Sequence, residues 1–213
     1  MNIIGAIRDQ NLLGAFIGRD LDTWRPWVTA LRVVYGMPVK STNGTALVHQ
    51  CTGRSAESMP EKGFDTALFL TGRRSGKSRI AACVGAFEAA LAGHETKLAK
   101  GEKGLVVILA PTKAQAGIVH GYLRSIFETP LLAGQVVSDT SGSLELENGI
   151  SVVVQAGDWK TIRGYTLVGV VLDEACFFGL TEESKVKSDT ELIRAVKPGL
   201  ATTGGKLVVI SSP

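Results

Sequence analysis

Short apolar runs with no internal polar alternation recur along the chain, and each ends at small or polar residues. They lie at 67–70, 105–109, 168–172 and 207–210. Val, Leu and Ile dominate these runs, which is typical of strands that are covered on both faces of a sheet. The pattern therefore predicts the strands of a central, mostly parallel β-sheet.

Segments with helical character separate these runs. One spans 80–91, a second begins around 110–112 and reaches about 127, and a third covers 190–196. Two more precede the first strand, at 22–35 and 43–50, and Asp22 is a suitable N-terminal cap for the former. Strands that alternate with helices in this way indicate an α/β fold whose mostly parallel central sheet is flanked by helices.

One segment departs from the parallel pattern. Apolar and polar residues alternate over 143–154 on both sides of Asn148-Gly149, a pair that favours a tight hairpin turn. We therefore expect an antiparallel hairpin to join the sheet. With 213 residues, 45% of them hydrophobic and 20% charged, the chain is long enough for a single compact domain. Within it we expect a helical N-terminal extension at 1–60 and a core at 61–213.

A basic turn with two glycines joins the first apolar run to the helix at 80–91. It reads Thr71-Gly72-Arg73-Arg74-Ser75-Gly76-Lys77-Ser78. A turn that opens a helix presents free backbone N–H groups and the positive end of the helix dipole, so it can bind phosphate. Gly76 permits close approach of the backbone, Lys77 can pair with the β- and γ-phosphates, and Ser78 can bind Mg²⁺. The turn predicts a nucleotide-binding P-loop at 72–78, with a solvated basic turn as the alternative.

Two acidic residues follow the apolar run at 168–172. Asp173 is expected at the carboxyl end of that strand, and this is the edge of a parallel sheet at which ligands bind. There it can hold Mg²⁺ together with Ser78, while Glu174 polarises the water that attacks the γ-phosphate. A polar strand end that leads into a helix is the alternative explanation of this pair.

The last apolar run ends in two hydroxyl residues, Ser211 and Ser212, which precede Pro213. A hydroxyl at this strand end can hydrogen-bond the attacking water or the γ-phosphate and relay its loss to a neighbouring segment. Such a coupling role is found in nucleotide-driven motors. The sequence Ser-Ser-Pro is equally compatible with an ordinary loop start.

Charge and cysteine content narrow the class of protein. The net charge is only +3, from 23 Lys and Arg against 20 Asp and Glu, which is small for a protein that binds DNA tightly by itself. Cys51, Cys83 and Cys176 are far apart, which argues for reduced thiols, and we expect Cys83 and Cys176 in or near the core. The histidines are isolated, and no segment reaches the ~20 apolar residues needed to cross a bilayer.

The order of these motifs resembles the ATPase domain of large terminase subunits, the DNA-packaging motors of tailed bacteriophages. The resemblance covers nearly the whole chain from about Trp24 onward. It rests on Thr52-Gly53-Arg54, the P-loop Gly72-Arg73-Arg74-Ser75-Gly76-Lys77-Ser78, Ala110-Pro111-Thr112-Lys113, Arg163-Gly164-Tyr165-Thr166, Leu172-Asp173-Glu174-Ala175 and Ile210-Ser211-Ser212-Pro213. Gly72 comes one position later than the standard P-loop spacing. Terminases share this deviation and carry an arginine four positions before the lysine, here Arg73.

The resemblance implies a terminase/ASCE-type P-loop NTPase that uses ATP and Mg²⁺ to drive double-stranded DNA into a procapsid. The implied partners are DNA, the portal protein and the small terminase subunit, with a ring of identical subunits during packaging or a monomer in isolation. The implied location is the cytoplasm of the host cell. A separate nuclease domain follows the ATPase domain in this family. We expect neither that domain nor nuclease activity within these 213 residues, because no acidic cluster suited to two metal ions lies beyond the ATPase motifs.

The resemblance also implies a nucleobase contact and catalytic arginines. Trp24 and Arg25 are candidates for the adenine pocket, although the tryptophan can equally anchor the helix at 22–35. Arg73 is a candidate to stabilise the transferring phosphate within its own subunit. Arg194 is the candidate to do so in a neighbouring subunit, with Arg163 as the second choice. For either of the last two, a plain surface arginine is the alternative.

Lys113 and Arg163 are the candidate DNA contacts. In a packaging motor the strand end before Lys113 faces the nucleic acid or the next subunit. Arg163 can also bind a phosphate or backbone carbonyls. Two other classes of function stay open. One is a helicase-like or repair DNA-dependent ATPase. The other is a nucleotide-binding module that is inactive unless it is assembled in a ring.

Overall fold

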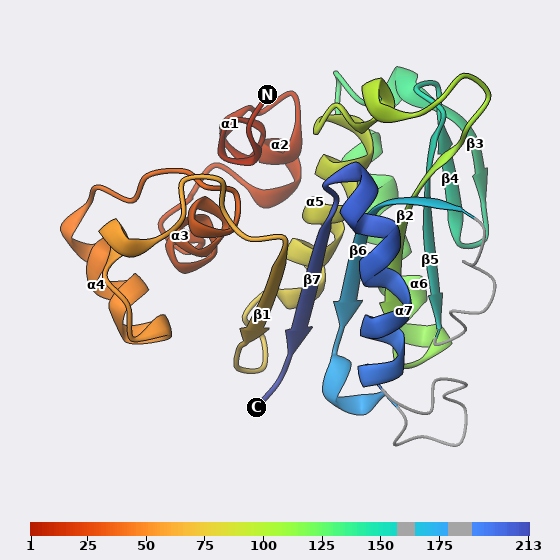
Figure 1. The fold of residues 1–213 in the computed structure, drawn as a ribbon. Coiled ribbons are helices and arrows are strands. Elements are labelled where there is room, and N and C mark those ends of the chain that lie inside the picture. Colours follow the sequence, from red (N-terminus) through yellow and green to blue (C-terminus); the bar gives the residue numbers. More distant parts are fainter. Residues whose placement is uncertain (157–164, 179–188) are drawn as a thin grey trace.

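A computed structural model describes residues 1–156, 165–178 and 189–213 (Figure 1). Within these stretches seven strands form one sheet in the order β1-β7-β6-β2-β5-β4-β3. Neighbours from β1 to β5 pair in parallel, whereas β4 is antiparallel to β5 and β3 is antiparallel to β4. The strands are β1 Thr66–Leu70, β2 Gly104–Ala110, β3 Val136–Thr140, β4 Ser143–Leu146, β5 Ile150–Ala156, β6 Thr166–Asp173 and β7 Lys206–Ser211.

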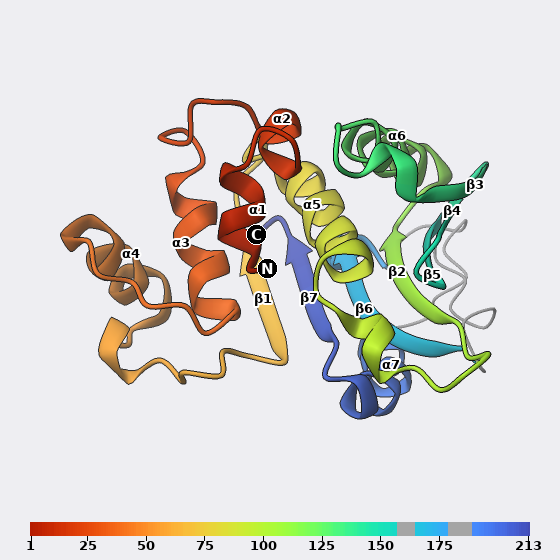
Figure 2. The same ribbon diagram turned by 90° about the horizontal axis from the view of Figure 1, so that it is seen from above.

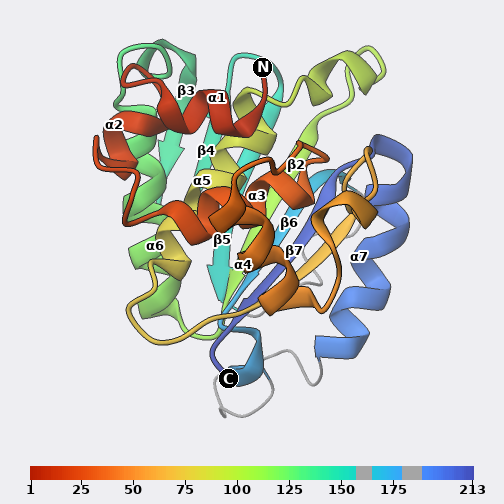
Figure 3. The ribbon, with the colours of Figure 1, turned by 90° about the vertical axis from the view of Figure 1, so that its left-hand side faces the viewer.

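Helices cover both faces of this sheet (Figure 2). Helices α5 (Lys77–Ala90) and α6 (Lys113–Phe127) pack on one face, and α7 (Asp189–Thr203) packs on the other. The N-terminal helices lie beside α5 and β1, and they stand in front of the sheet in Figure 3. They are α1 Ile3–Arg8, α2 Leu13–Ile17, α3 Arg25–Val34 and α4 Thr42–Thr52. Short 3-10 helices are η1 Ala56–Ser58, η2 His94–Lys97, η3 Ala133–Gln135 and η5 Ala175–Phe177.

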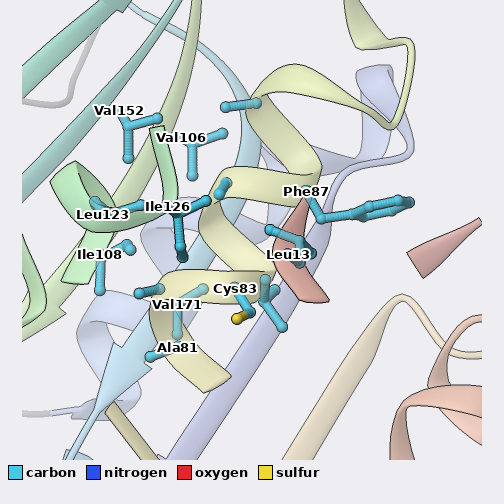
Figure 4. Packing of buried hydrophobic residues seen from close by; sticks show 14 of the residues in the cluster. Leu13, Ala81, Cys83, Phe87, Val106, Ile108, Leu123, Ile126, Val152 and Val171 are labelled. Atoms are coloured by element: carbon cyan, nitrogen blue, oxygen red, sulfur yellow. The ribbon is translucent and has the colours of Figure 1, made fainter. Parts of the chain in front are cut away.

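Strand β2 shows why the central strands are unbroken apolar runs. Its side chains alternate between two hydrophobic clusters, since Val106 and Ile108 face α5 and α6 while Val107 and Leu109 face α7. Burying each such side chain contributes about 1.5–3 kcal/mol. Figure 4 shows the first cluster, in which the two β2 side chains lie near Leu123 and Ile126 of α6, whereas Phe87 of α5 is directed away from them. The sheet thus forms a rigid base for the loops at its carboxyl edge.

A buried polar group links the N-terminal helices to α5 at the end remote from the P-loop. Glu88 accepts a hydrogen bond from the Tyr35 hydroxyl at 2.5 Å and lies 2.6 Å from His94 Nε2. Glu88 and His94 are 2% and 4% exposed. Burial, with the neighbouring Glu88 carboxylate, raises the pKa of the Tyr35 hydroxyl well above its usual range. The group is best explained as structural, because Tyr35 and His94 both pair with Glu88 inside the fold, although His94 Nδ1 has no hydrogen-bond partner among the described residues.

The α/β class with a mostly parallel sheet and an antiparallel hairpin is confirmed. The hairpin pairs Leu144 with Val152, close to the predicted Asn148-Gly149 turn. The helix expected at 43–50 is present as α4. Within the described ranges, no helix is long and apolar enough to cross a membrane.

Two expectations about helix ends were wrong. Helix α3 begins at Arg25 with Trp24 as its N-cap, and no side chain caps it. Asp22 lies too far before the first turn to do so, and its carboxylate pairs with Arg25 at 2.6 Å instead. Helix α7 does not end near residue 196 but continues through Pro198 to Thr203. Its apolar side is buried against the sheet in the second cluster, and this packing outweighs the loss of a backbone donor at the proline.

The sequence also missed one strand, and one further expectation was wrong. Strand β3 was not predicted, because its polar sequence at the sheet edge carries no apolar run, and Val137 is 66% exposed. Cys176 is exposed in η5 rather than in or near the core. Cys83 is buried in α5 as expected, and burial raises the pKa of its thiol to about 12.

Candidate functional site

The loop between β1 and α5 has a backbone suited to an anion. Gly76 is the N-cap of α5 and has a φ of 81°, which favours glycine, and Arg74 has a φ of 61°. Among the described residues, no side chain caps the N-terminus of α5. The first N–H groups of this helix, together with the helix dipole, therefore favour a bound phosphate.

Lys77, the first residue of α5, brings three separate segments together. It is 6% exposed, and its Nζ donates to the carbonyls of Thr71 and Gly72 at 3.3 and 3.2 Å. The same ammonium donates to Ser212 Oγ at 2.8 Å and lies 3.3 Å from Glu174 Oε1. The P-loop, the end of β6 and the end of β7 therefore meet at one positive charge.

Ser78 and Asp173 form the second link between the P-loop and β6. Ser78 Oγ donates to Asp173 Oδ2 at 2.7 Å. Asp173 is 1% exposed, and its Oδ1 is buried with no hydrogen-bond partner among the described residues. Burial raises the pKa of this carboxyl, with the charge of Glu174 adding to the effect and the Ser78 hydrogen bond opposing it.

The Ser78 and Asp173 oxygens fit a Mg²⁺ ion. A hydroxyl and a carboxylate are the hard oxygen ligands that Mg²⁺ takes, together with waters and substrate phosphates. The unpartnered Oδ1 of Asp173 is a buried acceptor that a cation would satisfy. A group of three or more His, Cys, Asp or Glu side chains that could hold a metal is absent from the described ranges. Waters and phosphate oxygens would complete such a coordination shell.

Glu174 is held in position by β7. Ser212 donates to its Oε2 through both the backbone N–H, at 3.3 Å, and Oγ, at 3.1 Å. Ser211 Oγ accepts from the N–H of Cys176 at 3.1 Å, so β7 also fixes the turn that follows Glu174. Glu174 has a positive φ of 54°, and it shares this property only with Arg74 among the non-glycine residues that the structure describes. Backbone strain of this kind clusters at functional sites.

One cavity of about 640 Å³ brings the P-loop, Glu174 and Ser212 together. Its volume is within the range of small-molecule sites. Its lining includes residues 73–78 of the P-loop together with Glu174 and Ser212. The sequence did not point to four further lining residues, which are Arg79, Gln115, Tyr122 and Phe177. Arg79 directly follows Ser78, so its position in the chain was a usable signal. The residues on α6 offered none, because they reach the cavity only through the packing of α6 against α5.

The structure separates the two residues proposed for a nucleobase. The Trp24 ring lies against the P-loop, where a Cβ built on Gly76 would be 2.6 Å from it. The Arg79 guanidinium lies 5.0 Å from the centroid of this ring. Arg25 points to solvent and pairs with Asp22, with a side chain that is 54% exposed. Of the two candidates, only Trp24 is therefore in contact with the P-loop.

The remaining candidates lie apart from the cavity lining. Arg194 is exposed on α7, and Lys113 is exposed at the first turn of α6. Arg163 lies outside the described residues. Arg73, in contrast, lines the cavity and is exposed. The geometry therefore joins Arg73 to the P-loop site, whereas Arg194 is not part of the cavity lining.

The fold and the cavity define an α/β protein whose P-loop and strand-end acids meet at the carboxyl edge of a parallel sheet. Comparison with solved structures identifies this fold more specifically. The crystal structure of the HK97 bacteriophage large terminase matches 99% of this chain and 37% of its own, with a TM-score of 0.60 and 18% identity. The Thermus phage P74-26 large terminase ATPase domain matches 86% of this chain and 68% of its own, with a TM-score of 0.51 and 21% identity.

The chain therefore has the fold of the phage large-terminase ATPase domain over most of its length, at low sequence identity. This agrees with the resemblance seen in the order of the sequence motifs. The chain spans well under half of the HK97 protein. No protein-family model and no curated protein matches it.

Proposed function

We propose that this chain is an ATP-hydrolysing motor domain that powers translocation of double-stranded DNA into a procapsid, as part of a terminase large subunit. The observation that carries the proposal is the convergence of Lys77, Ser78 and Glu174 on one cavity, with the buried Asp173 hydrogen-bonded to Ser78. The terminase-like fold supports the choice of a packaging motor over other P-loop ATPases. The cofactors of this proposal are ATP and Mg²⁺.

The residues of the cavity account for binding and for hydrolysis separately. The P-loop N–H groups and Lys77 bind the β- and γ-phosphates, and Ser78 and Asp173 hold the Mg²⁺. When bound, Mg²⁺ neutralises the charge that develops on the phosphate oxygens. A γ-phosphate at Lys77 competes with Glu174 for the same ammonium. Glu174 can then turn to orient a water and accept its proton.

Ser212 connects this chemistry to the sheet. It contacts both Lys77 and Glu174, so a change in either contact alters the end of β7. In the proposed motor, loss of the γ-phosphate therefore changes the hydrogen bonds of Ser212, and Ser211 holds the neighbouring turn through Cys176. Arg73 is proposed to stabilise the γ-phosphate within the subunit. Lys113 and Arg163 are proposed to contact DNA.

The proposed partners are double-stranded DNA, the portal protein, the small terminase subunit and further copies of this chain in a ring. The proposed location is the cytoplasm of the host cell. We propose no nuclease activity for residues 1–213.

A titration of ATPase rate against protein concentration tests the proposal. We expect hydrolysis that needs Mg²⁺, stops with EDTA, and shows a rate per subunit that rises with protein concentration as subunits meet. A zero rate at all concentrations, with measurable ATP affinity, would identify a nucleotide-binding module instead. Strand separation without packaging partners would favour a helicase-like or repair ATPase. Failure to bind ATP at all would contradict the nucleotide site itself.

Arg194 is proposed to act on the phosphate of a neighbouring subunit, because it is exposed on α7 and does not line its own cavity. Mixing an Arg194→Ala subunit with a Lys77→Ala subunit should restore part of the ATPase activity that each lacks alone. In the mixture, an intact arginine from one subunit can meet an intact P-loop of the other. An arginine of this kind contributes about 10³–10⁵ in rate. A mixture that stays as inactive as its components would count against the role.

A further inference from the structure

A tryptophan of the N-terminal extension contacts the P-loop but does not line the cavity. Trp27 Nε1 donates a hydrogen bond to the carbonyl of Ser75 at 2.6 Å, across 48 residues of chain. Trp27 is 6% exposed, and its ring packs edge-on against Phe69 of β1 at 5.3 Å between centroids. The indole is therefore fixed by the core, and its one polar atom is directed at the middle of the P-loop.

Two more contacts from the same extension surround the loop. The Trp24 ring covers Gly76, where an added Cβ would lie 2.6 Å from the ring. Arg79, in the first turn of α5, donates to the carbonyl of Phe16 and lies 4.8 Å from the Phe16 ring centroid and 5.0 Å from that of Trp24. The extension therefore contacts this segment at Ser75, at Gly76 and at Arg79.

The Trp27 contact has a consequence for the direction of a phosphate donor. The carbonyl of Ser75 and the N–H of Gly76 belong to one planar trans peptide, so they point in opposite directions. A carbonyl held on Trp27 thus directs the Gly76 N–H away from Trp27. Without such a contact this peptide would rotate readily, because glycine has access to many backbone conformations. The loop residues on both sides line the cavity.

We propose that Trp27 is a positioning residue that holds the Ser75–Gly76 peptide in the orientation needed to bind a polyphosphate. This inference rests on the proposed nucleotide site and names the part of the N-terminal extension that prepares it. Trp27 acts through the P-loop backbone and touches neither the base nor the phosphates. It differs in this from Trp24, whose proposed role is a contact with the nucleobase.

The test compares Trp27→Phe with Phe69→Leu. The first substitution removes the N–H and keeps an aromatic ring, whereas the second disturbs the same packing and leaves the N–H in place. Two probes are used with Mg²⁺: ATP, and inorganic tripolyphosphate, which has no base. We expect Trp27→Phe to weaken the binding of both probes by about 2- to 10-fold, which is the contribution of one hydrogen bond. We expect Phe69→Leu to change neither affinity by more than the error of the measurement, even where it lowers Tm equally.

Each other outcome overturns the inference. Weaker ATP binding with unchanged tripolyphosphate binding would show that Trp27 contacts the base. If both variants lose affinity in step with their loss of Tm, or if neither variant loses affinity, the role of the tryptophan is purely structural. If Trp27→Phe does not fold, β-(3-benzothienyl)alanine at position 27 keeps the shape and replaces the N–H with sulfur, and the same loss is expected. A wild-type chain that binds neither probe contradicts the proposed function, whereas normal wild-type binding with an unaffected variant contradicts only this inference.

Discussion

Glu174→Gln is expected to lower the rate of ATP hydrolysis by about 10²–10⁴-fold while ATP still binds, because the amide cannot accept the proton of the attacking water. The substitution keeps the shape of the side chain and an oxygen that can accept the hydrogen bonds of Ser212. Single-turnover hydrolysis and equilibrium binding of ATP, measured on the same sample, separate the chemical step from affinity.

The matched control is Glu145→Gln, which makes the same change at an exposed position on β4. Its hydrolysis rate should equal that of the wild type. If Glu174→Gln hydrolysed ATP at the wild-type rate, Glu174 would not be the base. The strand-end pair would then be a structural feature of β6.

Lys77→Met is expected to weaken ATP binding by at least about 30-fold. Removing one partner of a buried, hydrogen-bonded charge pair costs about 2–5 kcal/mol, and 2 kcal/mol corresponds to roughly 30-fold in affinity. Methionine retains the apolar stem of the side chain, so the loss reflects the ammonium. The same change removes the cation that lies 3.3 Å from Glu174. Isothermal titration calorimetry with ATP and Mg²⁺ measures the effect.

Lys100→Met serves as the control for this loss of charge, because Lys100 is exposed and does not line the cavity. ATP affinity should stay at the wild-type value in this variant. Equal ATP affinity in Lys77→Met and Lys100→Met would place the phosphates elsewhere.

The parts of the site that the sequence predicted are those fixed by strand ends. The P-loop and the Asp173-Glu174 pair each follow an apolar run, and the carboxyl ends of parallel strands share one edge of a sheet. Their meeting therefore followed from the fold class. The order of the strands did not, since β7 lies between β1 and β6 although it comes last in the chain. That placement is what brings Ser212 to Lys77 and Glu174.

The parts that the sequence could not predict depend on packing between distant elements. Gln115 and Tyr122 reach the cavity only because α6 lies against α5. The hydrogen bond from Trp27 to Ser75 joins residues 48 positions apart, and no local pattern encodes it. The same reason explains why α7 continues past residue 196, because its apolar side is buried against the sheet. The cap expected at Asp22 failed for a local reason, since the helix begins at Arg25 and the Asp22 carboxylate pairs with that residue.

The most direct measurement is a crystal structure with Mg²⁺ and a non-hydrolysable ATP analogue. We expect the γ-phosphate within hydrogen-bond distance of Lys77 Nζ and the metal in contact with Ser78 Oγ. Asp173 should ligate the same ion directly or through one water, and Glu174 should face the γ-phosphate. An analogue bound away from residues 72–78, or a metal that contacts neither Ser78 nor Asp173, would contradict the proposed nucleotide site.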